Sequence, residues 1–301
     1  MGTGRLFDRY VVVDWSAAAT PKTGADSVWI AALTSGAEPG TINPRTRAEA
    51  IEIVAEIMAD DRKSDRRTLV GFDFPFGYPA GTVAALGVLP GNWRGIWKLL
   101  RTVVVDRADN WNNRFAVAGD LNRRIGAAAG PFWGCPRAQE TRHLSGTRPD
   151  YANIPLPERR MVDDVARFRA AGLPGAPQPV WKTYTAGSVG GQALTGIAAL
   201  ARLLHARPDL AEGTRIWPLD TGMQAPYAAR TVWVELYPTM FADPPAAGQV
   251  KDEAQVVGAA RWLEATDGAG RLPGLFRRPA GIADAQAAAI VREEGWIFGL
   301  P

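Results

Sequence analysis

Short apolar runs separated by turn residues mark the first quarter of the chain. Residues 10–16 (YVVVDWS) and 26–33 (DSVWIAAL) are rich in β-branched and aromatic side chains, which predicts two strands joined as a hairpin. Asn43 before Pro44 then predicts a helix start, because asparagine caps helices and proline fits their first turn. Apolar residues recur at helical spacing beyond it, and residues 68–74 (TLVGFDF) predict another strand.

Regular patterns return near the end of the chain. Residues 190–206 predict a long helix with a leucine-rich face, and residues 215–219 and 231–236 predict strands. Residues 251–264 and 282–294 have the pattern of helices. This order of elements predicts an α/β fold, in which helices pack on a mixed sheet.

The middle of the chain is different. Residues 80–189 contain many Gly, Pro and Arg residues and scattered tryptophans, and only residues 161–171 have a helical pattern. We therefore expect residues 1–79 and 190–301 to form the core, and residues 80–189 to form a large irregular insertion.

Basic charge is concentrated in this insertion. Of the 34 Lys+Arg and 31 Asp+Glu residues, 15 basic and 8 acidic ones lie between positions 91 and 190, and the rest of the chain is net negative. A localised basic region fits a nucleic acid or nucleotide partner, although a solvated arginine-rich surface gives the same balance. The tryptophans among these arginines fit base stacking, but packing of a small core is the favoured interpretation.

Composition restricts the class of protein and its metal chemistry. With 301 residues, 47% of them hydrophobic, the chain can bury a substantial core. It has no apolar run of about 20 residues and no signal-peptide pattern at its start, so we expect a cytoplasmic protein without a membrane span. The single cysteine, Cys135, and the two histidines, His143 and His205, cannot assemble a classical zinc site. Any metal is expected on oxygen ligands.

Four acidic residues lie in apolar segments, where burial of a carboxylate is unfavourable. Asp14, Asp73 and Glu235 each lie toward the carboxyl end of an apolar strand, and Asp284 has small or apolar neighbours on its helix face, so we expect it to face inward. Binding crevices of α/β sheets form at strand carboxyl ends, and clustered carboxylates suit a pair of Mg²⁺ or Mn²⁺ ions. For each acid alone, capping a loop or pairing with an arginine is the simpler alternative.

Four segments resemble the ribonuclease-H-like superfamily, in particular an uncharacterised family of predicted nucleases. They are VVVDWSA (11–17), GFDFPFGYP (71–79), VELYP (234–238) and GIADAQAAA (281–289). The second segment is the most specific. The likeness covers roughly residues 8–79 and 190–296, in that order, and does not reach the insertion.

The resemblance implies a ribonuclease-H-like mixed sheet with flanking helices. It also implies that Asp14 corresponds to a first-strand metal ligand, Asp73 to the acid on the fourth strand, Glu235 to a later strand acid and Asp284 to the aspartate on the last helix. Members of the superfamily use such acids to bind two magnesium ions and to hydrolyse nucleic acid. This chain has no histidine near the last of these positions, so no catalytic base is identified.

Three further residues are candidates for substrate binding. Residues 185–192 form a glycine-rich turn at a predicted helix start, where Ser188 and backbone N–H groups can receive a phosphate with help from Lys182. An ordinary helix cap explains the same pattern. Lys251 starts a predicted helix and either neutralises the acids, contacts a substrate phosphate or is simply solvated.

Two functions follow from these patterns. The first is a metal-dependent phosphodiesterase or nuclease that uses the carboxylate cluster and two divalent cations. The second is a non-catalytic or nucleotide-binding accessory protein with the same fold, and some relatives are associated with molybdopterin guanine dinucleotide synthesis.

Overall fold

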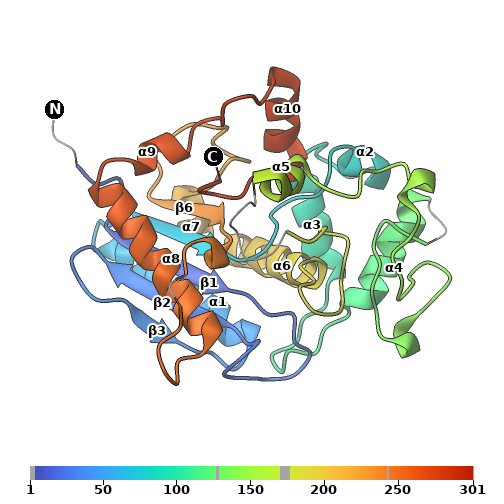
Figure 1. Cartoon of the computed structure of the whole chain (residues 1–301), viewed down its shortest axis with the longest axis horizontal. Helices are drawn as coiled ribbons and strands as arrows, with labels where there is room; N and C mark the ends of the chain where they lie inside the picture. Colours follow the sequence, from blue (N-terminus) through green and yellow to red (C-terminus); the bar gives the residue numbers. More distant parts are fainter. Residues whose placement is uncertain (1–3, 127–128, 170–176, 243, 301) are drawn as a thin grey trace.

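One mixed sheet organises the chain (Figure 1). The computed structural model describes residues 4–126, 129–169, 177–242 and 244–300, and these form a six-stranded sheet of order β3-β2-β1-β4-β6-β5. The strands are β1 (Arg9–Asp14), β2 (Trp29–Thr34), β3 (Gly40–Ile42), β4 (Thr68–Phe72), β5 (Thr214–Ile216) and β6 (Thr231–Glu235). Strand β2 is antiparallel to β1 and β3, whereas β1, β4, β6 and β5 are parallel. The predicted α/β architecture with a mixed sheet is confirmed.

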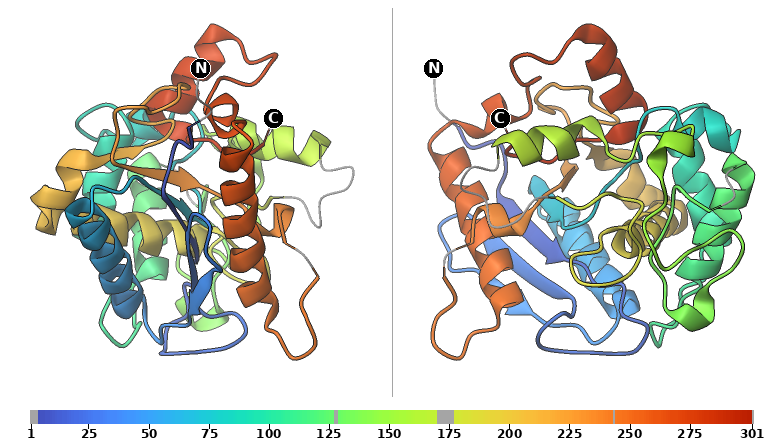
Figure 2. Two further views of the ribbon diagram at one scale, coloured as in Figure 1. Left: turned by 90° about the vertical axis from the view of Figure 1, so that its left-hand side faces the viewer. Right: turned by 45° about the vertical axis from the view of Figure 1, so that its right-hand side comes forward.

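Helices cover both faces of the sheet (Figure 2). Side chains alternate along β1, so Val11 and Val13 pack in one hydrophobic cluster with α1, α3, α4 and α6, whereas Val12 packs in another with α8. The helices are α1 (Arg47–Lys63), α2 (Thr82–Leu86), α3 (Trp93–Val103), α4 (Arg114–Ile125), α5 (Met161–Arg169), α6 (Gly190–Ala206), α7 (Pro208–Gly213), α8 (Lys251–Gly268), α9 (Leu272–Leu275) and α10 (Asp284–Ala289), which continues as a π-helical turn over Ile290–Glu294. Within the described part of the chain, no helix has both the length and the apolarity to cross a membrane.

The predicted hairpin and the long helix at 190–206 are confirmed, but the first helix starts later than predicted. Helix α1 is capped by Thr46, whose hydroxyl accepts a hydrogen bond from the Glu49 N–H (3.2 Å). Asn43 instead accepts a hydrogen bond from the Gly24 N–H (2.7 Å). Its amide therefore fixes the loop of the hairpin rather than the start of a helix.

The segment 80–189 is more regular than predicted, because it contains α2, α3 and α4 besides α5. Residues 170 and 171 of the predicted helix lie outside the described residues. Trp93, Trp97 and Trp181 are buried, which agrees with the packing interpretation, but they lie in the same cluster as the strands rather than in a small core of the segment's own. The segment and the sheet thus share one hydrophobic core.

Gly77 allows the chain after β4 to contact the π-helical turn closely. A Cβ atom at this position would lie 2.1 Å from the carbonyl oxygen of Glu293 and 2.6 Å from that of Glu294. The Glu294 side chain also accepts a hydrogen bond from the Ala80 N–H (2.8 Å). These contacts position the segment that begins at Asp73.

We expect Gly77→Ala to lower the free energy of unfolding by about 2 kcal/mol or more, because the methyl group collides with backbone that cannot move aside easily. Gly91→Ala is the matched control, since a Cβ there meets no atom within 4 Å. Urea denaturation of both variants measures the difference. Equal stability of the two variants would contradict the close approach at Gly77.

Candidate functional site

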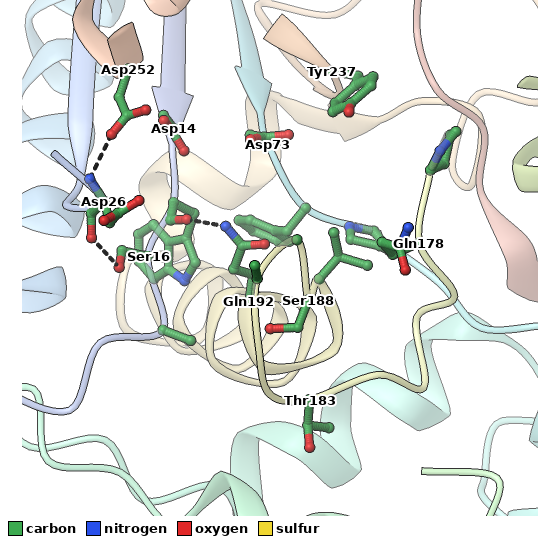
Figure 3. Close-up of a pocket in the computed structure, with 18 of the residues that line it drawn as sticks. Asp14, Ser16, Asp26, Asp73, Gln178, Thr183, Ser188, Gln192, Tyr237 and Asp252 are labelled. Atoms are coloured by element: carbon green, nitrogen blue, oxygen red, sulfur yellow. Dashed lines mark hydrogen bonds between the residues drawn. The ribbon is translucent and has the colours of Figure 1, made fainter. Parts of the chain in front are cut away.

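A pocket of about 930 Å³ lies at the carboxyl ends of the parallel strands (Figure 3). Asp14 ends β1, Asp73 follows β4 and Glu235 ends β6, and all three line this pocket. The segment 183–189 before α6 and the first turn of α8 form other parts of its wall. Three of the four predicted acids therefore meet at the edge where α/β sheets bind ligands.

Parallel pairing of β1 with β4 places two carboxyl groups side by side. Val13 is opposite Phe72 in the register, and the Asp73 N–H donates a hydrogen bond to the Val13 carbonyl (2.9 Å). The carboxyl groups of Asp14 and Asp73 are close enough to affect each other's ionisation. Within the described residues, no lysine or arginine forms an ion pair with either of them.

The environment of this pair disfavours two negative charges. Burial, and then the negative charge of Glu235, raise the pKa of Asp73 to about 7. Burial and the charges of Asp73 and Asp252 raise the pKa of Asp14 well above its usual range. Because both pKa values are raised, the pair retains a proton to higher pH than exposed aspartates do when nothing else is bound.

Asp252 is a further carboxylate of the pocket, and it was not predicted. It lies in the first turn of α8, and its Oδ2 accepts a hydrogen bond from the Asp26 N–H (2.7 Å; Figure 3). The neighbouring Lys251, which was predicted to bind substrate, is exposed and does not line the pocket. An acid in the first turn of a helix is common because it stabilises the helix dipole, so the sequence carries no signal for its role here.

Glu235 lines the pocket but is bound by an arginine. Arg160 donates to both of its carboxylate oxygens, at 2.7 Å each, and also to Asp163 (2.9 Å). In the sheet register Glu235 pairs with Phe72 rather than with Asp73, so it extends toward the other face of the sheet. Burial still raises the pKa of Glu235, and the Arg160 charge opposes this rise. Its oxygens are engaged in holding Arg160.

The prediction that Asp284 faces inward is wrong. This residue begins α10, its side chain is 95% exposed, and it forms an ion pair with Arg278 at the surface. Of the small residues on its helix face, Ala288 is exposed and only Ala287 packs against a hydrophobic cluster. Asp284 therefore does not belong to the carboxylate cluster.

The predicted phosphate-binding residues are only partly at the pocket. Ser188 lines it, beside Gln192, whose amide donates to the Trp15 carbonyl (Figure 3). Lys182 does not line it, because its ammonium group donates to the Ala186 carbonyl (2.9 Å) and closes its own turn. The N-cap of α6 is Val189, which has no side-chain cap, so Ser188 is not a helix cap.

Two further pocket residues were not predicted, Tyr237 and Arg114. Tyr237 lies near Asp73 (Figure 3), and burial together with the Asp73 charge raises the pKa of its hydroxyl. The hydroxyl therefore stays protonated and can donate a hydrogen bond to a bound anion. Tyr237 belongs to the VELYP segment, but nothing in the spacing distinguishes it from a core aromatic residue.

Comparisons with protein-family models, with curated proteins and with solved structures find no match to this chain. Within the described residues, no group of three or more His, Cys, Asp or Glu side chains is arranged to hold a metal ion. The acid pair Asp14–Asp73 is the part of the predicted cluster that remains available to a ligand.

The raised pKa values predict how stability depends on pH. In a chelator, we expect the free energy of unfolding to fall as pH rises from about 4 through about 7, because the folded protein binds a proton at Asp73 that the unfolded chain has released. Asp73→Asn weakens this dependence, leaving the part that comes from the raised pKa of Asp14, and stabilises the protein at pH 8 by on the order of 2–4 kcal/mol. Urea denaturation across this pH range measures the effect. Asp284→Asn is the control and should follow the original protein.

The ion pairs of Arg160 with Glu235 and Asp163 predict a loss of stability when the arginine is replaced. Arg160→Met leaves Glu235 and Asp163 buried without a positive partner, which should cost about 3–5 kcal/mol of stability. Arg148→Met is the control, because the ion pair of Arg148 with Glu158 is largely exposed and contributes at most about 1 kcal/mol. If both variants lose the same small amount in denaturant titrations, Arg160 does not neutralise a buried carboxylate pair.

Proposed function

We propose that the pocket hydrolyses a phosphodiester of a nucleotide or nucleic acid with the help of Mg²⁺ or Mn²⁺. The observation that carries this proposal is the adjacent pair Asp14–Asp73, which lines a pocket and has no positive partner among the described residues. Buried acids without partners are costly, and such sites are often functional.

The residues of the pair fit a divalent cation. Both supply hard carboxylate oxygens, and Mg²⁺ is commonly held by one or two carboxylates together with waters and substrate phosphates. A bound cation would replace the proton that the pair retains and would offset the burial and repulsion that raise both pKa values. When bound, the ion would polarise the phosphate and favour ionisation of an attacking water. Asp252 is close enough to influence the charge of Asp14 and adds negative potential for a further ion.

The remaining pocket residues position the substrate. Hydrolysis adds water across the phosphorus–oxygen ester bond and yields a phosphate monoester and an alcohol, so negative charge develops on the phosphoryl oxygens. The protonated hydroxyl of Tyr237 can donate a hydrogen bond to one of these oxygens. Arg160 already forms ion pairs with Glu235 and Asp163, so its role is to order the pocket wall.

A ribonuclease-H-like sheet is part of the same proposal. Asp14 on the first strand and Asp73 directly after the fourth occupy the places that the resemblance assigns to metal ligands. The antiparallel hairpin edge followed by parallel strands is compatible with it. Asp284 departs from this pattern, since it lies at the surface. The proposed site therefore relies on two strand acids rather than on four converging acids.

The test measures hydrolysis of bis(p-nitrophenyl) phosphate and of short oligonucleotides with Mn²⁺, Mg²⁺ or EDTA. We expect activity only with metal and a loss of at least about 100-fold in Asp14→Asn and Asp73→Asn, since each removes a ligand. Asp284→Asn should keep full activity.

Two results would reject hydrolysis at this site. One is full activity of Asp73→Asn, and the other is absence of activity with every cation. Nucleotide binding without metal and without turnover would favour the alternative, a nucleotide-binding accessory protein; Mn²⁺-dependent thermal stabilisation that disappears in Asp14→Asn would support the metal site.

A further inference from the structure

The positive side chains of the pocket differ in whether a carboxylate neutralises them. Three basic residues line the pocket. Lys22 pairs with Asp26 (3.5 Å), and Arg160 is bound by two carboxylates. Arg114 has no ion pair with any described acidic residue.

The surroundings of Arg114 leave its charge uncompensated. Its Nη1 donates to the Asn112 side chain (2.9 Å), and its Nε is buried without a hydrogen-bond partner. Burial, and then the neighbouring Arg47, lower the pKa of Arg114 to about 10. Asp106, whose charge acts on Arg114, is already held by Arg47 through two hydrogen bonds. A partly buried guanidinium without a carboxylate partner is stabilised when an anion binds to it.

Packing places Arg114 between the acid strand and α6. A Cβ atom at Gly191 would lie 3.2 Å from Arg114 Cδ and 3.2 Å from Ala17 Cβ. The stem of the arginine therefore packs at the start of α6, next to the chain that leaves β1 three residues after Asp14. Its guanidinium also lies over the Phe115 ring (4.3 Å), which restricts its orientation. One pocket thus contains an acid pair and a fixed arginine with no acidic partner.

We propose that Arg114 binds a second phosphate of the substrate, next to the phosphodiester that is hydrolysed at Asp14 and Asp73. This inference rests on the proposed function, and it specifies a nucleotide substrate with two phosphates. A planar guanidinium matches phosphate oxygens in a bidentate way, which an ammonium group cannot do. The exposed ring of Tyr184 lines the same pocket and offers a stacking surface for a base.

The volume of the pocket agrees with a short substrate. Pockets that bury small molecules have volumes of about 300–1,000 Å³, and the observed value of about 930 Å³ lies at the upper end. A dinucleotide with a 5′-phosphate has both phosphate groups, namely the scissile diester and the terminal monoester. It also has bases that can stack. The pair pTpT and TpT differs only in the phosphate that we assign to Arg114.

Binding is tested apart from catalysis in an Asp73→Asn background, by calorimetric titration with pTpT and TpT. We expect pTpT to bind about 10- to 100-fold more tightly, as charge-assisted hydrogen bonds allow. Adding Arg114→Gln should abolish this preference, and adding Arg114→Lys should retain only part of it. Arg107→Gln is the matched control, since this exposed arginine lies over Trp111 in the same segment and outside the pocket. A preference that survives Arg114→Gln, or equal binding of both ligands in the Asp73→Asn background, would overturn the proposal.

Kinetics with Mn²⁺ separate this inference from the proposed function. We expect Arg114→Gln to raise KM for pTpT by about 10-fold or more while the values for TpT change little. If the variant hydrolyses both dinucleotides as the original protein does, the Arg114 assignment fails and the hydrolase stands. If binding depends on Arg114 but no dinucleotide is hydrolysed, the hydrolase fails and the phosphate site stands. A melting temperature of Arg114→Gln close to that of Arg107→Gln shows that the fold is intact.

Discussion

The parallel pairing of β1 with β4 is the constraint on which the site depends. It fixes Asp73 beside Val13 through a backbone hydrogen bond, and it thereby brings two carboxyls together at the edge of a buried sheet. Neither acid has a positive partner among the described residues, so burial of the two acids destabilises the folded protein. Protonation of the pair, which the raised pKa values favour, reduces the repulsion in the free protein, and a cation would reduce it further.

The strands and long helices were predictable because their side chains repeat with the period of the backbone. The run before Asp14 and the helix at 190–206 needed no tertiary information. Asn43 shows the limit of this approach, since its amide fits a helix cap and a hairpin loop equally well, and only the position of Gly24 decides between them. Helix α3 was missed although its buried residues Trp93, Ile96, Trp97 and Leu100 recur at helical spacing. Helix α4 has a weaker pattern, because it buries only Val117, Ala118, Leu121 and the polar Asn122.

Only those residues of the candidate site that lie at the carboxyl ends of strands were predictable from the sequence. Asp14 and Asp73 follow apolar strands that pair in parallel, so sequence and structure agree for them. Glu235 has the same local pattern, but a register shift of one residue turns it to the other face, where Arg160 binds it. Asp284 has the helical spacing of a buried residue and is nevertheless exposed, because alanines alone do not determine which face of a helix packs.

The insertion contributes charge to the pocket as well as hydrophobic packing. Both Arg160 and Arg114 come from the segment 80–189, and both face the acids of the sheet. Arg160 has two carboxylates at 2.7 and 2.9 Å, so its charge is balanced within the protein. Arg114 has none among the described residues, so solvent or a ligand is left to balance its charge. A ligand with an anionic group for Arg114 and a group that binds a cation at the acid pair would satisfy both parts of the pocket. A nucleotide with two phosphates has this distribution of charge.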